Sequence, residues 1–193
     1  MTKNEQRKEA LEVRRKISDE DKLIKSLLIM ENTLKLIDEI KTVKVVAVYL
    51  STKEEVCLDN LVKLLIKNDY KVMAPRINND ILDFYYIDKK SCDLENGFEI
   101  NRYGIREPLT SNIIANINDA DIILCPGLLF DNDFNRLGHG KGYYDKTIKN
   151  VKGIKVGICF DIQIVDQVIA DVNDITMDYL ITESNIFKKQ IIS

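Results

Sequence analysis

The chain has 193 residues, of which 45% are hydrophobic and 31% are charged, and its net charge is −3. These values are typical of an ordinary globular domain and exclude a disordered or fibrous chain. The negative charge argues against a nucleic-acid-binding protein, because neutralising several phosphates needs a basic surface. Every apolar run is shorter than the ~18 residues of a membrane span, so we expect a soluble protein without membrane contact.

The first segment, residues 3–16, has helical spacing and carries a local charge of +3, which leaves about −6 for the rest of the chain. A helix face in solvent explains this pattern, and so does a helix that faces an anion. The segment lacks the apolar stretch of a secretory signal, so we expect a cytoplasmic protein. The four cysteines lie more than thirty residues apart, which favours reduced thiols over disulfides or zinc ligands: Cys57, Cys92, Cys125 and Cys159.

The next segments alternate between helix and strand. Apolar residues spaced by three and four predict helices over 20–40 and 58–68, and a β-branched run predicts a strand over 44–50. Further strands are expected at 70–74, 81–87, 121–125, 155–160 and 179–182. Strands separated by helices indicate a mostly parallel sheet covered on both faces. We therefore predict one Rossmann-like, three-layer α/β/α domain over residues 1–193, with 88–118 as a surface excursion that contains short strands.

The glycines are concentrated late in the chain. Four of the eight lie within residues 127–142, and Gly138, Gly140 and Gly142 occupy alternate positions. This stretch follows the strand at 121–125 and precedes a helical segment at 143–150. In open α/β sheets ligands bind at such strand ends, and free N–H groups at a helix start suit phosphate. A glycine-rich turn that serves packing alone is the alternative.

Charged residues bracket this glycine loop. Arg136 and Lys141 would supply a planar donor fork and a point charge to a polyphosphate. Asp145 would repel phosphate unless a cation lies between them, and Mg²⁺ fills that role with one or two carboxylates. The spacing matches neither a Walker A loop nor a dinucleotide fingerprint, so a different kind of nucleotide loop is predicted.

The run Pro126-Gly127-Leu128, Phe130-Asp131 and 135–145 resembles the signature of the 5-formyltetrahydrofolate cyclo-ligases, also called methenyltetrahydrofolate synthetases. Other stretches follow in family order over essentially the whole chain: Lys3 with Arg7, 49–51 with Glu55, 74–76, 104–108 and 177–178. The resemblance implies that Arg136, Lys141 and Tyr144 are catalytic. It implies ATP contacts from Lys3, Arg7, Arg136, Leu137, Gly138, His139, Gly140, Lys141, Gly142, Tyr143 and Tyr144. It further implies folate contacts from Leu50 and Glu55, and Mg²⁺ held by Asp145 and Asp178.

Two of these positions stay open. Many family members have arginine where this chain has His139, so that side chain either donates a hydrogen bond or points away. Glu55 suits the 2-amino-4-oxo edge of a pterin, because a carboxylate accepts two hydrogen bonds, but without the resemblance it would be a solvent-facing turn residue.

The resemblance implies ATP-dependent conversion of 5-formyltetrahydrofolate, with or without a polyglutamate tail, to 5,10-methenyltetrahydrofolate. Phosphorylation of the formyl oxygen would be followed by attack of N10, while Tyr144 and Tyr103 hold the pterin. A monomer is expected. Three alternatives remain: a nucleotide-binding protein without turnover, an interaction module built on the N-terminal helices, and a different ligase or kinase that acts on a small acid.

Overall fold

The computed structural model describes residues 1–89 and 97–190. None of the helices in these residues could span a membrane. Cys57, Cys125 and Cys159 are free thiols, as predicted, and Cys92 lies outside the described residues.

The predicted helices are confirmed with small shifts of their ends. The helices are α1 (Lys3–Arg15), α2 (Asp19–Ile40), α3 (Asp59–Lys67) and α4 (Tyr143–Ile148). Side chains cap the first two: Thr2 and Glu5 form a reciprocal capping box on α1, and the Ser18 Oγ accepts the backbone N–H of Asp21 at 3.0 Å on α2. Two 3₁₀ turns, η1 (Ile117–Asp119) and η2 (Asp161–Gln163), lie further along the chain.

Eight strands of the described residues form the central sheet in the order β13-β12-β10-β7-β1-β2-β3-β6. Strands β12, β10, β7, β1 and β2 are parallel. At the two edges, β13 pairs antiparallel with β12, β3 with β2, and β6 with β3. The predicted α/β fold with a mostly parallel sheet is therefore confirmed. The strands are β1 (Val45–Ala47), β2 (Lys71–Asn78), β3 (Ile81–Ile87), β6 (Ile114–Ala115), β7 (Ile122–Pro126), β10 (Ile154–Ile158), β12 (Tyr179–Ile181) and β13 (Ile186–Lys188).

The connection between β2 and β3 differs from a strand–helix–strand unit. A tight turn with Asn79 at a φ of 53° joins them, and the two strands pair antiparallel over the full length of β3. Asparagine tolerates this left-handed conformation, which explains why the chain reverses here without a helix.

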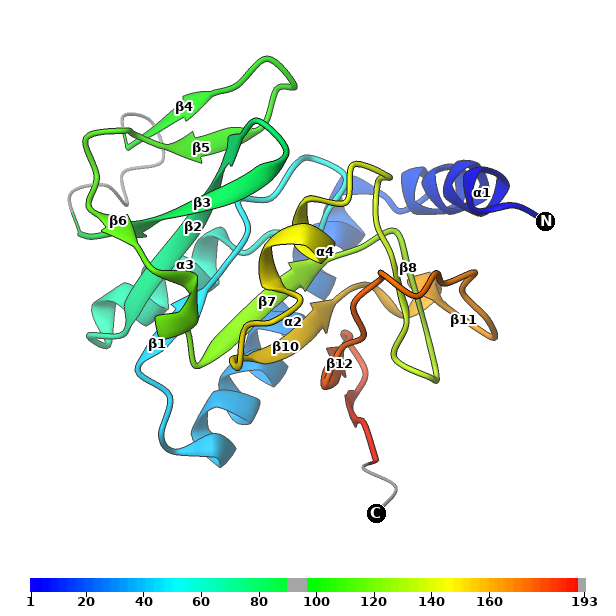
Figure 1. The fold of residues 1–193 in the computed structure, drawn as a ribbon. Coiled ribbons are helices and arrows are strands. Elements are labelled where there is room, and N and C mark those ends of the chain that lie inside the picture. Colours follow the sequence, from blue (N-terminus) through cyan, green and yellow to red (C-terminus); the bar gives the residue numbers. More distant parts are fainter. Residues whose placement is uncertain (90–96, 191–193) are drawn as a thin grey trace.

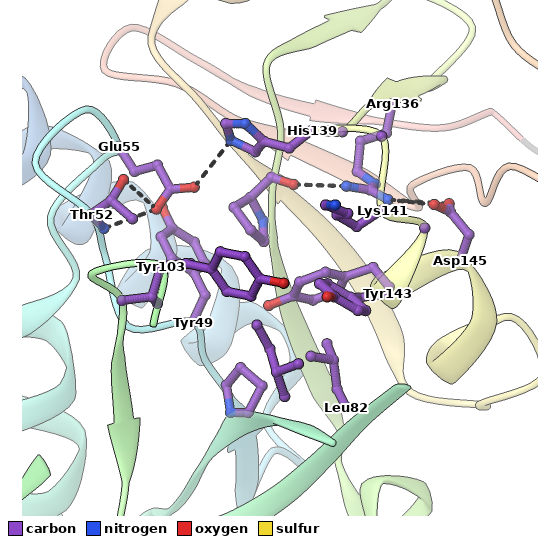
Figure 2. A pocket seen from close by; sticks show the side chains of 18 of the residues that line it. Tyr49, Thr52, Glu55, Leu82, Tyr103, Arg136, His139, Lys141, Tyr143 and Asp145 are labelled. Atoms are coloured by element: carbon purple, nitrogen blue, oxygen red, sulfur yellow. Dashed lines mark hydrogen bonds and ion pairs between the residues drawn. The ribbon is translucent and has the colours of Figure 1, made fainter. Parts of the chain in front are cut away.

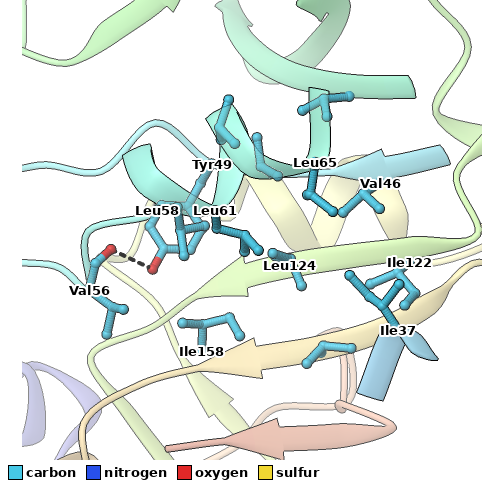
Figure 3. Packing of buried hydrophobic residues seen from close by; sticks show 14 of the residues in the cluster. Ile37, Val46, Tyr49, Val56, Leu58, Leu61, Leu65, Ile122, Leu124 and Ile158 are labelled. Carbon is cyan, nitrogen blue, oxygen red and sulfur yellow. Dashed lines mark hydrogen bonds between the residues drawn. The ribbon is translucent and has the colours of Figure 1, made fainter. Parts of the chain in front are cut away.

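Two apolar clusters cover opposite faces of the sheet. On one face α2 and α3 pack against β1, β7 and β10, and Figure 3 shows Ile37, Leu61 and Leu65 over this cluster. On the other face Ile148 of α4 packs near Ile123 and Cys125 of β7. The glycine loop leads directly into α4, so this helix fixes where the loop ends (Figure 1).

A second, three-stranded sheet was not predicted. It is formed by β11 (Ile164–Val165), β8 (Leu129–Asp131) and β9 (Arg136–Leu137). Helix α1 packs on it, with Ala10 in one cluster with Leu129 and Leu137. The excursion at 88–118 contains the predicted short strands in its described part, as the hairpin of β4 (Phe98–Ile100) and β5 (Arg106–Pro108) together with β6.

Candidate active site

A cavity of about 740 Å³ opens where β1 and β7 end. Its walls come from α1, the chain that follows β1, the β4–β5 hairpin and the glycine loop. This volume lies in the range of cofactor and substrate sites. The structure brings the following sequence-predicted residues to its lining: Lys3, Arg7, Leu50, Glu55, Tyr103, Arg136, Leu137, Gly138, His139, Gly140, Lys141, Gly142, Tyr143, Tyr144 and Asp145.

Helix α1 contacts the glycine loop directly. The Arg7 Nε donates a hydrogen bond to the Gly138 carbonyl at 3.0 Å. Gly140 has a φ of +94°, and a Cβ there would lie 3.2 Å from the Arg7 Cζ. Gly142, with a φ of +67°, is the N-cap of α4. Glycine suits these positions because of the backbone conformation and because of the close approach of Arg7.

A buried ion pair joins the loop to α4. The Arg136 Nη2 donates to both carboxylate oxygens of Asp145, at 3.1 and 3.0 Å, and its Nη1 donates to the Pro126 carbonyl at 3.1 Å. Arg136 is 5% exposed. Its Cζ lies 5.5 Å from the ring centre of Tyr144, a cation–π arrangement. The guanidinium is therefore held in one orientation at the cavity wall.

A second group of charges was only half predicted. The Lys3 Nζ lies 2.5 Å from Asp174 Oδ2 and 2.6 Å from Asp171 Oδ2, and all three residues line the cavity. Burial alone would lower the pKa of Lys3, but its hydrogen bonds to the two carboxylates outweigh burial and raise it. Burial alone would raise the pKa of Asp174, but its hydrogen bonds from Lys3 and the Asp171 backbone, together with the charges of Lys3 and Arg136, outweigh burial and lower it. The segment 171–174 therefore places two carboxylates in the cavity wall together with the glycine loop.

The structure does not bring together Asp145 and Asp178, the two predicted Mg²⁺ ligands: Asp145 lines the cavity and Asp178 does not. Asp178 is exposed beside the amino end of β12, where its Oδ2 accepts the backbone N–H of Lys155 at 2.8 Å. The carboxylate near Asp145 is instead Asp174, because the Asp145 Oδ1 accepts the adjacent Ile175 N–H at 3.1 Å. Parallel strands send their carboxyl ends toward the cavity, so a residue just before β12 lies at the wrong edge.

Glu55 lies on the opposite wall, as Figure 2 shows. Its Oε2 accepts the backbone N–H and the hydroxyl of Thr52 at 2.9 and 3.0 Å, and its Oε1 is 3.9 Å from the His139 Nε2. The carboxylate side chain is only 10% exposed, so it is not a solvent-facing turn residue. Burial lowers the pKa of His139, while the charge of Glu55 acts in the opposite direction. His139 points toward Glu55 across the cavity.

The chain matches the model of the 5-formyltetrahydrofolate cyclo-ligase family over residues 1–183. It belongs to this family. Among cyclo-ligase relatives, the probable 5-formyltetrahydrofolate cyclo-ligase of Schizosaccharomyces pombe is 31% identical over 78% of this chain and 80% of its own. The 5,10-methenyltetrahydrofolate synthetase of Aquifex aeolicus has a similar solved structure, with 34% identity, a TM-score of 0.84 and coverage of 97% and 93%. That of Mycoplasma pneumoniae is 26% identical, with a TM-score of 0.75 and coverage of 95% and 99%.

The predicted family membership, and with it the prediction of an enzyme of this kind, is confirmed. Apolar and aromatic residues to which the sequence assigned no role complete the cyclo-ligase cavity: Tyr49, Pro75, Ile77, Leu82 and Ile105. Tyr49, Pro75 and Ile105 lie in stretches that carry the family resemblance, whereas no local pattern marked Ile77 and Leu82. Tyr103 and Tyr143 approach each other from the hairpin and from α4 (Figure 2). Burial raises the pKa of Tyr144 well above its ordinary value, which keeps its hydroxyl protonated.

Proposed function

We propose that this chain catalyses the conversion of 5-formyltetrahydrofolate to 5,10-methenyltetrahydrofolate, with Mg²⁺ present and with hydrolysis of ATP to ADP and phosphate. One observation carries the proposal: a single cavity has a glycine loop with several cations on one side and a recessed carboxylate among apolar and aromatic side chains on the other. The first half suits a polyphosphate and the second suits a pterin.

The nucleotide half is built around the loop 136–144. Lys3, Arg7, Arg136 and Lys141 reach it from α1 and from the loop itself, and each lines the cavity. Backbone N–H groups at the start of α4 add further donors. Helix α4 has only six residues, so the fixed cations contribute most of the attraction for phosphate. The expected anion-facing role of the basic helix is part of this proposal.

The carboxylates of Asp145 and Asp174 fit a bound Mg²⁺ ion. Among the described residues no group of three or more histidine, cysteine, aspartate or glutamate side chains forms a metal cage. Mg²⁺ does not need one, because it commonly binds one or two carboxylates together with water and substrate phosphates. Asp145 is paired with Arg136 and Asp174 with Lys3. A bound phosphate group would pair with these cations instead and leave the two carboxylates for the metal. When bound, the ion would neutralise charge on the phosphoryl oxygens.

The folate half is formed around Glu55 and Leu50. The Oε1 of Glu55 has no hydrogen bond among the described contacts, and the Thr52 donors hold its Oε2 in place. A fixed carboxylate can accept hydrogen bonds from the 2-amino group and ring N–H of a pterin. Leu82 and Ile77 supply apolar surface to the cavity, and Tyr103 and Tyr143 supply aromatic faces.

The reaction follows from holding the two substrates in line. The formyl oxygen attacks the γ-phosphorus of ATP, the bond from that phosphorus to the bridging oxygen breaks, and ADP departs. N10 then attacks the activated formyl carbon, N10 loses its proton, and the C–O bond breaks to release phosphate. Arg136 and Lys141 stabilise charge on the transferring group, and Tyr144 packs against Arg136 and fixes it.

ADP release distinguishes this enzyme from a nucleotide-binding protein that does not turn over. Purified protein with ATP and Mg²⁺ should form ADP only when 5-formyltetrahydrofolate is added, in equal amount to the methenyl product. ADP formation that ignores the folate would contradict the proposal.

The setting of the enzyme is also proposed. The chain would act as a monomer, and the buried free thiols Cys125 and Cys159 suit a reducing cytoplasm. The substrate would enter with or without a polyglutamate tail, and neither nucleic acid nor membrane would take part.

A further inference from the structure

Arg14 is an unusual residue of α1. Its side chain is among the largest fully buried ones, at 2% exposure, although it is an arginine at the end of a helix. Its Nε has no hydrogen-bond partner among the described residues. A buried guanidinium nitrogen without such a partner is costly, so the retention of Arg14 needs an explanation. The mechanism proposed above does not use it.

The neighbours of Arg14 belong to the folate half of the cavity. The charges that act on it most strongly are those of Glu55 and Glu54, followed by the Tyr49 hydroxyl and the adjacent Arg15. Glu54 has its own cation, since the Lys22 Nζ lies 3.8 Å from it. Arg14 also acts on His139, the residue across from Glu55. Burial lowers the pKa of Arg14 in spite of these carboxylates.

We infer that Arg14 is a positioning residue for substrate, acting through Glu55 from behind the cavity wall. Arg14 does not itself line the cavity, whereas Glu55 does. Thr52 fixes one carboxylate oxygen of Glu55 by hydrogen bonds, and the positive charge of Arg14 holds the anion in the wall with its other oxygen toward the ligand. The inference rests on the proposed function, because it takes Glu55 as the folate contact.

The same helix face serves both halves of the site. Lys3, Arg7, Ala10 and Arg14 follow the spacing of three and four that places side chains on one face. Lys3 and Arg7 contact the nucleotide side through Asp174 and Gly138, and two turns later the charge of Glu55 acts on Arg14. A substitution that undocks α1 would therefore weaken the binding of both substrates. A substitution of Arg14 that acts only through Glu55 would weaken the binding of the folate alone.

A double-mutant cycle tests the inference. Wild type, Arg14→Met, Glu55→Gln and the double variant are compared by calorimetric titration with 5-formyltetrahydrofolate and by KM for each substrate. Arg14→Met should weaken folate binding and raise the KM for 5-formyltetrahydrofolate about tenfold, which is the scale of one charge-assisted interaction. The kcat and the KM for ATP should stay within twofold of wild type. In the Glu55→Gln background the same change should cost less than twofold, because residues that act through one another are not additive.

Two further variants exclude a merely structural effect. Arg15→Met removes the exposed neighbouring cation and should leave folate binding within twofold of wild type. Arg14→Lys keeps the charge and should restore most of the loss. Methionine keeps the apolar stem of the buried side chain, and thermal unfolding checks that the variant remains folded. An equal loss in both Glu55 backgrounds, or an equal rise in both KM values, would overturn the inference. A wild type that binds no folate would refute the proposed function itself.

Discussion

Replacement of Asp145 by asparagine removes the one carboxylate that touches both Arg136 and the 174–175 turn. The side chains of Arg136 and Asp145 are 5% and 19% exposed, and the carboxylate accepts three hydrogen bonds. Loss of one partner from a fully buried pair costs ~3–5 kcal/mol. The partial exposure of Asp145 and the remaining amide oxygen reduce this to about 2 kcal/mol. For a chain of this size the unfolding midpoint should fall by about 4–8 °C.

The second effect of Asp145→Asn is on the metal. If Asp145 holds Mg²⁺ beside the nucleotide, the concentration of Mg²⁺ that gives half-maximal rate should rise at least about tenfold, the factor that 1.4 kcal/mol represents. Initial rates of methenyl product formation, measured by ultraviolet absorbance across a MgCl₂ series, give this value. Rates are compared at a temperature well below the lowered midpoint, so that unfolding does not contribute.

Asp178→Asn is the matched control. Asp178 is exposed outside the cavity, and an asparagine can still accept the Lys155 N–H, so both the midpoint and the Mg²⁺ dependence should stay near those of wild type. An Asp145→Asn enzyme with the Mg²⁺ dependence of wild type would refute the metal assignment. An unchanged unfolding midpoint would refute the energetic importance of its pair with Arg136.

Three further changes test other parts of the structure. Gly157→Ala would place a Cβ 2.5 Å from Phe130 and 2.7 Å from Leu180, so overpacking should cost ~1–3 kcal/mol and lower the melting midpoint without changing kcat; an unchanged midpoint would be inconsistent with this packing. Gly140→Ala strains a φ of +94° and displaces Arg7, so the KM for ATP should rise about tenfold and that for folate far less, as initial rates with each substrate varied will report. Burial lowers the pKa of His139, so the contribution of this side chain to stability is complete above pH 6.5 and is lost as the pH falls through the lowered pKa. The His139→Gln variant, followed by urea unfolding, should therefore lose less stability than wild type over that pH range. Parallel plots of stability against pH for the two proteins would argue against this.

Long periodic segments and the glycine loop were predictable from the sequence, because their signals are local. The stripe of α2, the β-branched run of β1 and the alternating glycines each predicted the observed element. The strands β8, β9 and β11 have two or three residues, too few for any periodicity, and their pairing depends on contacts across the chain.

Site residues were predictable where this sequence matches the motifs of the family, and the other residues of the site were not. Asp178 and Asp174 are four residues apart in the same acidic stretch, and only the contact of Asp174 with Lys3, 171 residues away, shows which one faces the cavity. Arg14 belongs to a charge cluster that also fits a helix face in solvent, and its burial follows from how α1 docks. Such long-range contacts leave no mark in local sequence.

The central claim is that this cavity joins ATP consumption to ring closure of a folate. The most direct measurement is the absorbance of the methenyl product after purified protein is mixed with 5-formyltetrahydrofolate, ATP and Mg²⁺, beside a mixture without ATP. We predict a rise that requires ATP and is lost in Lys141→Ala protein that remains folded. No rise from a folded protein that still binds ATP would contradict the claim.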